Sequence, residues 1–508
     1  MNFGFPGWRA VGWPVLWGVG IALGQAPLGW WPVALIALVL LFVLVHKAAD
    51  WRAAAWLAWA AGLGYFGISL SWIISPFLVE PEIYGWMAPF ALILMAAGMA
   101  LFWAAAGAVS GLTRHRGLGF AVGLAGFEAL RGVLFTGFPW AMVAHMWVDT
   151  AFAQLASVVG VNGLNLLTLL VAASFTVFRR WVGPVTWVGF MGAWFLSGVL
   201  QNAPAGPSRD VSLRLVQPNL AQDLKWDADH ASENFTRLLD LTRQGTPADL
   251  TIWPETAVPY LIDNQPEVGQ MIAAASGGRA VIVGYQRIDG PLGWNSMGLI
   301  GPTGEITQFY DKAHLVPFGE YIPFGDIAYD WFGLQAFASQ LGAAYSGGPG
   351  PAVMDLGPEF GVILPLICYE AIFPAFVNAA PERADWILQI TNDAWFGTLT
   401  GPWQHVAQVR FRAIEQGLPV VRVANTGVTA VYDAHGQVVD GMGLTFRNGV
   451  GPVGELILPF GTAAVLDVPF IPGALPPTPY SRWGEVPFLL LLGGCGAALV
   501  LGRKRLPA

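Results

Sequence analysis

The feature that most constrains this chain is a set of long runs without a single Asp, Glu, Lys or Arg. A helix that spans a membrane needs about 20 mainly apolar residues, so each run is long enough to cross a bilayer. Charged residues make up only 11% of the 508-residue chain, against about 25% in soluble domains. A purely cytosolic globular protein is therefore disfavoured. The charge-free runs are Ala10–His46, Ala53–Val79, Ile83–Thr113, Thr150–Phe178, Trp181–Ser208 and Val486–Gly502.

We expect seven membrane helices before residue 205 and one after residue 485, eight in all. The first run is split by a turn at Gly24–Pro27 and supplies two helices, and the apolar segment Gly117–Val148 supplies another. The predicted domains are therefore a transmembrane domain at 1–205 and a C-terminal transmembrane helix at 485–503. A signal peptide is a weaker interpretation of the first run, because it lacks an A-x-A cleavage site followed by a hydrophilic chain.

Glu128 and Arg131 are the clearly intramembrane charges in this pattern. They lie three residues apart, so they can share one face of a helix. Ionisable groups within a membrane are costly and often functional. An ion pair that ties helices together is an equally good explanation, and the sequence leaves both open.

Basic residues in the short loops predict the orientation of the membrane helices. If the N-terminus is cytoplasmic, ten basic residues fall on that side and none falls in the opposite short loops. Both termini are then cytoplasmic, and 208–480 lies in the periplasm, outside the inner membrane of a bacterium. The ten residues are Arg9, Lys47, Arg52, Arg114, Arg116, Arg179, Arg180, Arg503, Lys504 and Arg505.

The segment 208–480 has ordinary charge and alternates β-rich runs with amphipathic stretches. This alternation predicts an α/β domain with buried strands flanked by helices. The amphipathic stretches include Ser232–Arg243 and Trp403–Gln416. The β-rich runs are Val211–Val216, Leu250–Trp253, Ala280–Tyr285, Gly361–Cys368, Trp386–Thr391 and Pro419–Ala424.

Composition and motif searches argue against several classes of function. A net charge of −8 without a basic tract disfavours nucleic-acid binding. Two cysteines, Cys368 and Cys495, cannot make a disulfide framework. The chain has no P-loop, no His-Glu-x-x-His, no Gly-x-Ser-x-Gly and no histidines at metal-ligand spacing. We therefore expect neither a metal nor a cofactor.

Three chemically capable side chains follow predicted strands: Glu255, Lys312 and Cys368. Sites form at strand ends of open α/β sheets. A nearby cation lowers the pKa of a thiol, a glutamate can take and return its proton, and a lysine can stabilise an oxyanion. Together the three residues predict nucleophilic catalysis. Singly, each also fits a structural role, as a buried apolar cysteine or a solvated surface charge.

The motifs around these residues resemble those of the nitrilase superfamily. They are Trp-Pro-Glu at 253–255, Asp-Lys-x-His-Leu-x-Pro-Phe-Gly-Glu-Tyr-x-Pro at 311–323 and Ile-Cys-Tyr-Glu at 367–370. With its membrane helices, the chain is similar over nearly its whole length to the apolipoprotein N-acyltransferase family. The resemblance implies a nitrilase-like α-β-β-α sandwich at 208–480, joined to a polytopic α-helical membrane domain of about eight transmembrane helices.

The same resemblance implies a catalytic triad and several supporting residues, without a departure from the pattern at the triad. Asn-Asp-Ala-Trp-Phe-Gly at 392–397 fits the family pattern, whereas the Leu-Lys-Trp motif that suggests a substrate-facing tryptophan is short. The implied triad is Glu255, Lys312 and Cys368, and the supporting or substrate-binding residues are Glu320, Tyr369, Glu370, Trp226 and Trp395.

The implied reaction has two half-steps and proceeds by a ping-pong scheme. Cys368 takes the sn-1 acyl chain of a phospholipid, expected to be phosphatidylethanolamine, and forms a thioester. The α-amine of the S-diacylglyceryl cysteine that begins an apolipoprotein then takes the chain. The resemblance also suggests a monomer.

Two other functions remain as alternatives at this stage. A membrane-anchored amidase or nitrilase would use the same triad with water as the second nucleophile, although eight helices are excessive for an anchor. A transporter with an extracytoplasmic binding domain would carry polar residues through several helices, and here Glu128 and Arg131 alone are clearly intramembrane.

Overall fold

The computed structural model describes residues 8–177, 182–222, 225, 229–322, 345–445, 452–455, 457–458 and 460–503. The chain divides into two compact units. Unit 1 consists of Met1–Pro204, Leu399–Gln416 and Pro477–Ala508, and unit 2 of Ala205–Thr398 and Gly417–Pro476. Trp226, one of the predicted site residues, lies outside the described residues.

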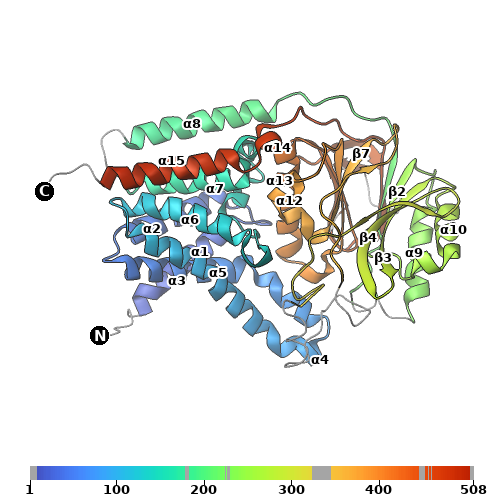
Figure 1. The fold of residues 1–508 in the computed structure, drawn as a ribbon, viewed down its shortest axis with the longest axis horizontal. Helices are drawn as coiled ribbons and strands as arrows, with labels where there is room; N and C mark the ends of the chain where they lie inside the picture. The colour runs from blue at the N-terminus through green and yellow to red at the C-terminus, as the bar shows by residue number, and fades with distance from the viewer. Residues whose placement is uncertain are drawn as a thin grey trace. The chain divides into compact units, whose positions relative to one another are not determined.

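Unit 1 is a bundle of helices formed mainly by the charge-free runs (Figure 1). Small residues let its helices approach closely. A Cβ at Gly107 would lie 2.5 Å from the carbonyl oxygen of Ala54, a kind of contact typical of membrane helices. The main helices are α1 (Trp8–Ala22), α2 (Trp31–His46), α3 (Trp51–Ser69), α5 (Ala88–Ser110), α6 (Arg116–Arg131), α7 (Ala156–Ser174), α8 (Val182–Gln201), α13 (Gly401–Gln416), α14 (Pro479–Trp483) and α15 (Val486–Arg503).

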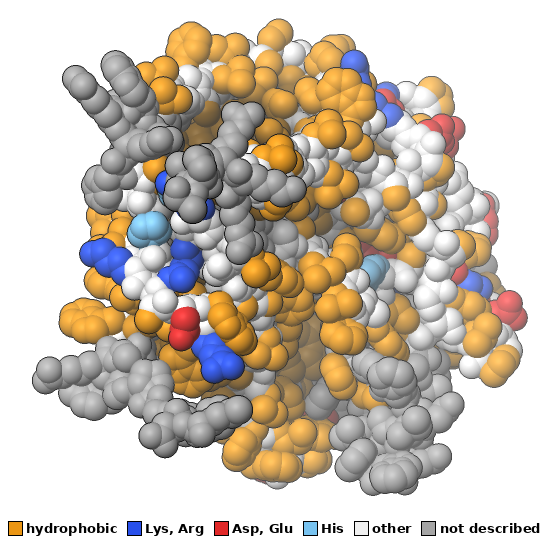
Figure 2. Space-filling view, turned by 60° about the vertical axis from the view of Figure 1, so that its left-hand side comes forward, with side chains coloured by type: hydrophobic (Ala, Val, Ile, Leu, Met, Phe, Trp, Pro, Cys, Tyr) orange, Lys and Arg blue, Asp and Glu red, His pale blue; other side chains and the backbone are white. Residues whose placement is uncertain are grey.

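Among the described residues, two segments are long and apolar enough to cross a membrane: Pro81–Ser110 and Ala151–Ser174. A bent pair, Trp51–Ser69 with Ser71–Leu78, would make a third. The expected number of about eight spans is therefore not confirmed, since several of the other apolar helices are shorter. Large hydrophobic side chains are nevertheless exposed along α5, α8 and α15, and Figure 2 shows hydrophobic side chains over much of the face it presents. Such a surface is that of a membrane protein.

A segment of irregular backbone and short 3₁₀ helices after α6 is held inside the bundle by side chains from the surrounding helices. Gly137 and Ala141 in this segment have positive φ values of 85° and 55°. Irregular backbone at membrane depth needs protein partners for its polar groups. These partners are Arg131 on the carbonyls of Phe138 and Trp140, Tyr65 on that of Ala141, Gln25 on that of Met142, and Asn165 on the amide of Ala144.

Glu128 and Arg131 belong to this structural network. Glu128 accepts hydrogen bonds from Trp103 Nε1 at 3.0 Å and from Asn165 Nδ2 at 2.7 Å, and lies 3.8 Å from Arg131. Both charged residues are 1% exposed. Of the two interpretations left open by the sequence, the structure favours the one in which the pair ties helices together.

Helix α13 packs with unit 1, although it lies within the segment 208–480 in the sequence. Its Glu415 accepts a hydrogen bond from the amide of Val161 at 2.8 Å, beside a break in α7 where Gly160 has a φ of 69°. Its Gln404 accepts one from Trp140 Nε1 at 2.6 Å. This helix therefore links the chain of the α/β segment to the core of the helical bundle.

Unit 2 contains two six-stranded sheets (Figure 1). The first has the order β14-β1-β2-β3-β4-β5, and the second has the order β13-β10-β9-β8-β7-β6. A small ribbon of β11 (Asp440–Thr445) and β12 (Pro452–Glu455) completes the described strands. The first sheet is formed by β1 (Leu213–Gln217), β2 (Leu250–Ile252), β3 (Ala280–Asp289), β4 (Leu292–Ile300), β5 (Ile306–Asp311) and β14 (Ala464–Val468). The second is formed by β6 (Met354–Asp355), β7 (Val362–Ile367), β8 (Trp386–Thr391), β9 (Val420–Ala424), β10 (Thr429–Tyr432) and β13 (Ile457–Leu458).

The central strands of both sheets are parallel, and they are mainly hydrophobic, as strands of a parallel sheet buried on both faces are. Strands β1, β2 and β3 pair in parallel, as do β7, β8 and β9. Every residue of β1, β2, β8 and β9 is buried, as expected for strands covered on both faces. The carboxyl ends of parallel strands meet at one edge of a sheet, which brings the residues that follow β7 and β8 to the same edge of the second sheet.

The two sheets pack on each other, with contacts between β1 and β9 and between β4 and β7. Helices α9 (Ala231–Thr242) and α10 (Pro266–Ala275) cover the first sheet, where Phe235, Leu238 and Ile272 pack against its strands. All six predicted β-rich runs form strands, and both predicted amphipathic stretches form helices. Two packed sheets are the core that the resemblance stated above leads us to expect.

Candidate active site

Glu255 lies directly after β2 and is the centre of a buried hydrogen-bond network. Pro254 and the end of the strand fix its backbone, and its side chain is turned away from solvent. Oε1 accepts a hydrogen bond from Asn295 Nδ2 at 2.7 Å, and Oε2 accepts one from the amide of Asn392 at 2.9 Å. The carboxylate is thus held in one orientation by residues from both sheets.

Lys312 follows β5 and points its ammonium group at two carboxylates. Nζ lies 2.9 Å from Glu320 Oε1 and 3.4 Å from Glu255 Oε1, and the residue is 1% exposed. Burial alone would lower the pKa of Lys312, but the charges of Glu320 and Glu255 raise it well above its ordinary value. Lys312 therefore remains a cation in the folded protein.

Cys368 lies at the sharp turn from β7 into the 3₁₀ helix η7 (Cys368–Ile372). Its φ of 50° is in the left-handed region, which is strained for a residue with a side chain. Gln389 Nε2 donates to its carbonyl oxygen at 3.1 Å, and the Thr391 hydroxyl hydrogen-bonds to its thiol. Strained turns of this kind occur at functional sites, where the surrounding structure enforces the backbone conformation.

The charges around Cys368 decide the state of its thiol. Burial raises the pKa of the Cys368 thiol well above its ordinary value, and the charge of Glu255 raises it further, whereas Lys312 and the Thr391 hydrogen bond lower it. The resting site therefore holds a neutral thiol, with a carboxylate near enough to act on it. The charge of Glu255 acts on this thiol, and a carboxylate is a group that can take a thiol proton.

Glu320 and Glu370 fix the loop that carries Lys312. Glu320 Oε2 accepts from the amide of Val316 at 2.8 Å, which closes the loop after Lys312. Glu370 Oε1 accepts from the hydroxyl of Tyr310 and the amide of Ala313, both at 2.7 Å, and its Oε2 accepts from the amide of Ile367 at 2.8 Å. Glu370 thus connects the lysine loop to the cysteine turn.

Tyr369 and Trp395 lie beside the cluster in different ways. The Tyr369 ring packs on His314, with centroids 5.8 Å apart, and meets Phe373 edge-on at 5.0 Å. Trp395 is half-buried in the 3₁₀ helix η8 (Asp393–Phe396), next to the Asn392 amide that holds Glu255. Glu255, Lys312 and Glu320 are thus joined by direct contacts, while Tyr369 and Glu370 belong to the turn that begins at Cys368.

Several residues of the cluster escaped the sequence reasoning. Asn295 lies in mid-strand β4 and donates to both Glu255 and Glu320, and nothing in its sequence context marks it. Thr391 ends a predicted strand, and this position is the one sequence feature that could have marked it as a site residue. Lys225 donates from Nζ to the carbonyl oxygen of Glu255 at 3.0 Å.

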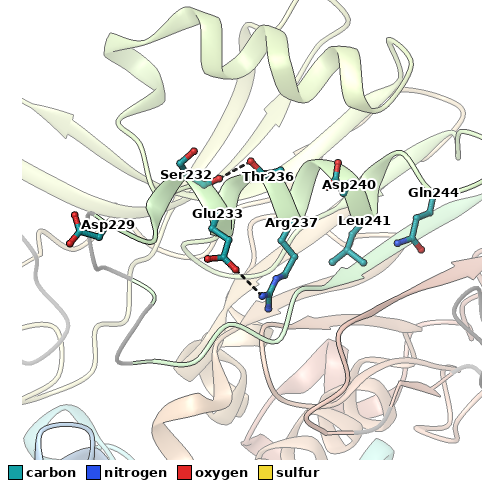
Figure 3. Close-up of a pocket in the computed structure, with 8 residues that line it drawn as sticks. All are labelled: Asp229, Ser232, Glu233, Thr236, Arg237, Asp240, Leu241 and Gln244. Atoms are coloured by element: carbon teal, nitrogen blue, oxygen red, sulfur yellow. Dashed lines mark hydrogen bonds and ion pairs between the residues drawn. The ribbon is translucent and has the colours of Figure 1, made fainter.

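Across the described part of the chain, no group of three His, Cys, Asp or Glu side chains could hold a metal ion. An open groove of about 670 Å³ runs along α9 instead, with Glu233 and Arg237 paired at 3.7 Å (Figure 3). Its lining residues lie between Asp229 and Gln244 and include none of the residues around Cys368.

Comparisons with known proteins match both parts of the chain. A family model described as the apolipoprotein N-acyltransferase N-terminal domain matches residues 17–174, and one described as carbon-nitrogen hydrolase matches residues 212–448. The apolipoprotein N-acyltransferase of Caulobacter vibrioides is 35% identical, over 96% of this chain and 93% of its own. That of Rhodopseudomonas palustris is 35% identical, over 99% and 96%. Among solved structures, an amidase from Nesterenkonia sp. is 19% identical with a TM-score of 0.36, over 56% of this chain and 97% of its own.

Proposed function

The chain belongs to the apolipoprotein N-acyltransferase family, and we propose that Cys368 carries the acyl group that it transfers. The donor is a phospholipid and the acceptor is the N-terminal S-diacylglyceryl cysteine of an apolipoprotein. The observation that carries this proposal is the buried cluster of Glu255, Lys312 and Cys368, in which a neutral thiol lies within the field of one carboxylate and one ammonium group.

In the first half-reaction Glu255 takes the proton of the Cys368 thiol, and the thiolate attacks the sn-1 ester carbon. The ammonium of Lys312 stabilises the oxyanion that develops on the carbonyl oxygen of the ester, which is the kind of preorganised electrostatic contact that lowers such barriers most. The carbon–oxygen bond then breaks. Glu255 returns its proton to the departing lysophospholipid, and a thioester remains on Cys368.

In the second half-reaction the α-amine of the apolipoprotein attacks the thioester carbon. Glu255 accepts the proton that the amine loses, and Lys312 again stabilises the oxyanion. The carbon–sulfur bond breaks, the N-acyl product leaves, and the thiolate recovers its proton from Glu255. Atoms and charge balance over the two steps without a metal or a cofactor.

We assign the supporting roles by the contacts described above. Glu320 holds Lys312, and Glu370 joins the lysine loop to the cysteine turn. Tyr369 and Trp395 are proposed as supporting or substrate-binding residues on the sequence resemblance. Trp226 is proposed as a substrate-facing residue on the sequence resemblance alone. Phosphatidylethanolamine as the donor and a monomeric enzyme are part of the same proposal.

We further propose that the chain lies in a bacterial inner membrane with both termini in the cytoplasm. Residues 1–205 and 485–503 would form the transmembrane part, and 208–480 the periplasmic catalytic domain. Ten basic residues in the loops of one side and none in those of the other support this orientation. Both substrates are anchored in the bilayer by their acyl chains, so the thiol must work near the outer headgroups.

The test is intact-mass measurement of the detergent-purified protein after incubation with a phospholipid of known chains. We expect a gain of one acyl group on Cys368 that hydroxylamine removes. Cys495→Ala is the matched control and should gain the same mass, whereas Cys368→Ala should gain none. Acyl transfer to an apolipoprotein peptide by Cys368→Ala would refute the proposal, and transfer of the acyl group to water alone would favour the amidase alternative.

A further inference from the structure

Lys225 is a second buried lysine at the cluster, and the mechanism above leaves it without a task. It is 3% exposed. Its Nζ lies 3.0 Å from the carbonyl oxygen of Glu255 and 2.7 Å from the hydroxyl of Thr256. A lysine is among the residues least often fully buried, because removing its charge from water is costly. A buried lysine is therefore expected either to neutralise a nearby negative charge or to hold a backbone conformation by its hydrogen bonds.

The charge balance of the cluster gives Lys225 a charge to neutralise. Glu320 and Lys312 cancel each other as a close ion pair. Asp393, the other carboxylate whose charge acts on Cys368, is paired with Arg422. The negative charge of Glu255 is left, and during the proposed reaction it moves to the Cys368 sulfur and on to the substrate oxygen. A buried charge without a counter-ion is strongly unfavourable. Among the described residues, Glu255 and Cys368 are the charged or titratable groups whose fields act on Lys225.

Lys225 also stabilises the conformation of the backbone next to Glu255. Thr256 has a φ of 46°, in the left-handed region that a threonine rarely adopts. The two hydrogen bonds from Lys225 fall on the Glu255 carbonyl and the Thr256 side chain, on either side of this strained residue's amide. They oppose a rotation that would carry the Glu255 carboxylate away from its partners.

We propose that Lys225 is a positioning residue of the acyl transfer, which fixes the Glu255–Thr256 backbone and serves as the counter-ion of the mobile negative charge. The inference rests on the proposed function, since the charge moves only if Glu255 and Cys368 exchange a proton. Lys225 does not touch the reacting atoms. Its ammonium group acts through Glu255 and through the electrostatic potential at the sulfur.

The experiment compares Lys225→Met, Lys225→Arg and wild type in two assays. One is the rate of thioester formation with a phospholipid, and the other is alkylation of Cys368 by iodoacetamide without phospholipid, both followed by mass. We expect Lys225→Met to form the thioester about 100-fold more slowly, with the KM for phospholipid within about threefold of wild type. Lys225→Arg, which keeps the charge, should recover most of the lost rate.

The pH profile of alkylation separates a charge effect from loss of structure. Burial lowers the pKa of Lys225 to about 8, against the charges of Glu255 and Cys368, which raise it. The wild-type profile should therefore bend near pH 8, where Lys225 loses its charge, and the bend should be absent in Lys225→Met. Thr256→Val removes one hydrogen bond but keeps the charge, and its profile should keep the bend.

Three results would overturn the inference. One is a Lys225→Met enzyme that forms the thioester within about threefold of the wild-type rate. Another is equal loss in the Met and Arg variants with an unchanged pH profile, which would mean that Lys225 only supports the fold. The third is a wild-type profile without a bend near pH 8. If wild type forms no thioester at all, the proposed function fails instead, while the alkylation profiles still report on Lys225.

Discussion

Replacing Gly284 by alanine should displace the carboxylate of Glu255, the proposed base, without touching it. Gly284 lies in β3 against the chain that carries Glu255, and a Cβ there would lie 2.4 Å from the Pro254 carbonyl oxygen, 2.5 Å from the Thr256 amide and 2.7 Å from Glu255 Cα. All three are backbone atoms, so a side-chain rotation cannot relieve the contact. A carbon and an oxygen need about 3.3 Å, so the two chains must separate by about 0.5–1 Å.

A displacement of this size predicts both a kinetic and a stability effect. A shift of about 1 Å in a catalytic group costs about 100-fold in rate, and overpacking costs about 1–3 kcal/mol of unfolding free energy. We expect Gly284→Ala to form the thioester about 100-fold more slowly. Mass spectrometry of the acyl-enzyme measures the rate, and thermal unfolding in detergent measures the stability.

Gly98→Ala is the matched control, because nothing lies within 4 Å of the Cβ that it would add. It should leave the acylation rate unchanged and stabilise α5 slightly, since alanine is the better helix former. A Gly284→Ala enzyme that acylates at the wild-type rate would show that the Glu255 backbone tolerates displacement. The argument for a preorganised carboxylate would then be wrong.

The remaining predictions concern three buried carboxylates. Glu320→Ala should lower the free energy of unfolding by about 3–5 kcal/mol, because it leaves the Lys312 ammonium without its closer partner. Glu320→Gln should lower it less. Thermal unfolding measures both, and equal effects would contradict the ion-pair argument. Burial raises the pKa of Glu370 to about 7, so its contribution to stability is full below about pH 4.5 and falls as the pH rises through 7. The wild type should therefore lose up to about 3 kcal/mol more than Glu370→Gln between pH 5 and pH 8, and parallel pH profiles would contradict this. Glu128→Ala should lower the melting temperature of the detergent-purified protein, because it leaves buried donors without an acceptor, and an unchanged temperature would contradict the structural role of the Glu128–Arg131 pair.

Much of the α/β architecture could be predicted because parallel strands need continuous hydrophobic runs. The residues of β8 and β9 are buried on both faces, so their sequences read as apolar blocks with clear ends. Strands β4 and β5 carry polar residues such as Asn295 and Gln308 among apolar ones, and they pair antiparallel. The weaker pattern of β4 explains why the sequence reasoning did not find it as a strand, whereas the run that forms β5 was expected to be strand-like because it precedes Lys312.

The candidate site could be predicted only where chemistry and strand ends coincide. Glu255 and Cys368 follow hydrophobic runs whose ends are evident in the sequence. Asn295 holds the Glu255 carboxylate from the middle of a strand, and its role comes from the register of β4 on β3, where it lies opposite Gln286. Lys225 comes to the cluster from a segment far from it in sequence. Tertiary contacts of this kind have no local signature.

The burial of the cluster bears on why a thioester suits this chain. Cys368, Lys312 and Glu255 are between 1% and 6% exposed, so water has little access to the sulfur or to an acyl group attached to it. In the proposed mechanism the neutral thiol is inert until Glu255 takes its proton, and a thioester formed there is shielded from hydrolysis. An amidase gains nothing from this shielding, because water is its second nucleophile. An acyltransferase depends on it, because the acyl group must wait for an amine while water is far more abundant.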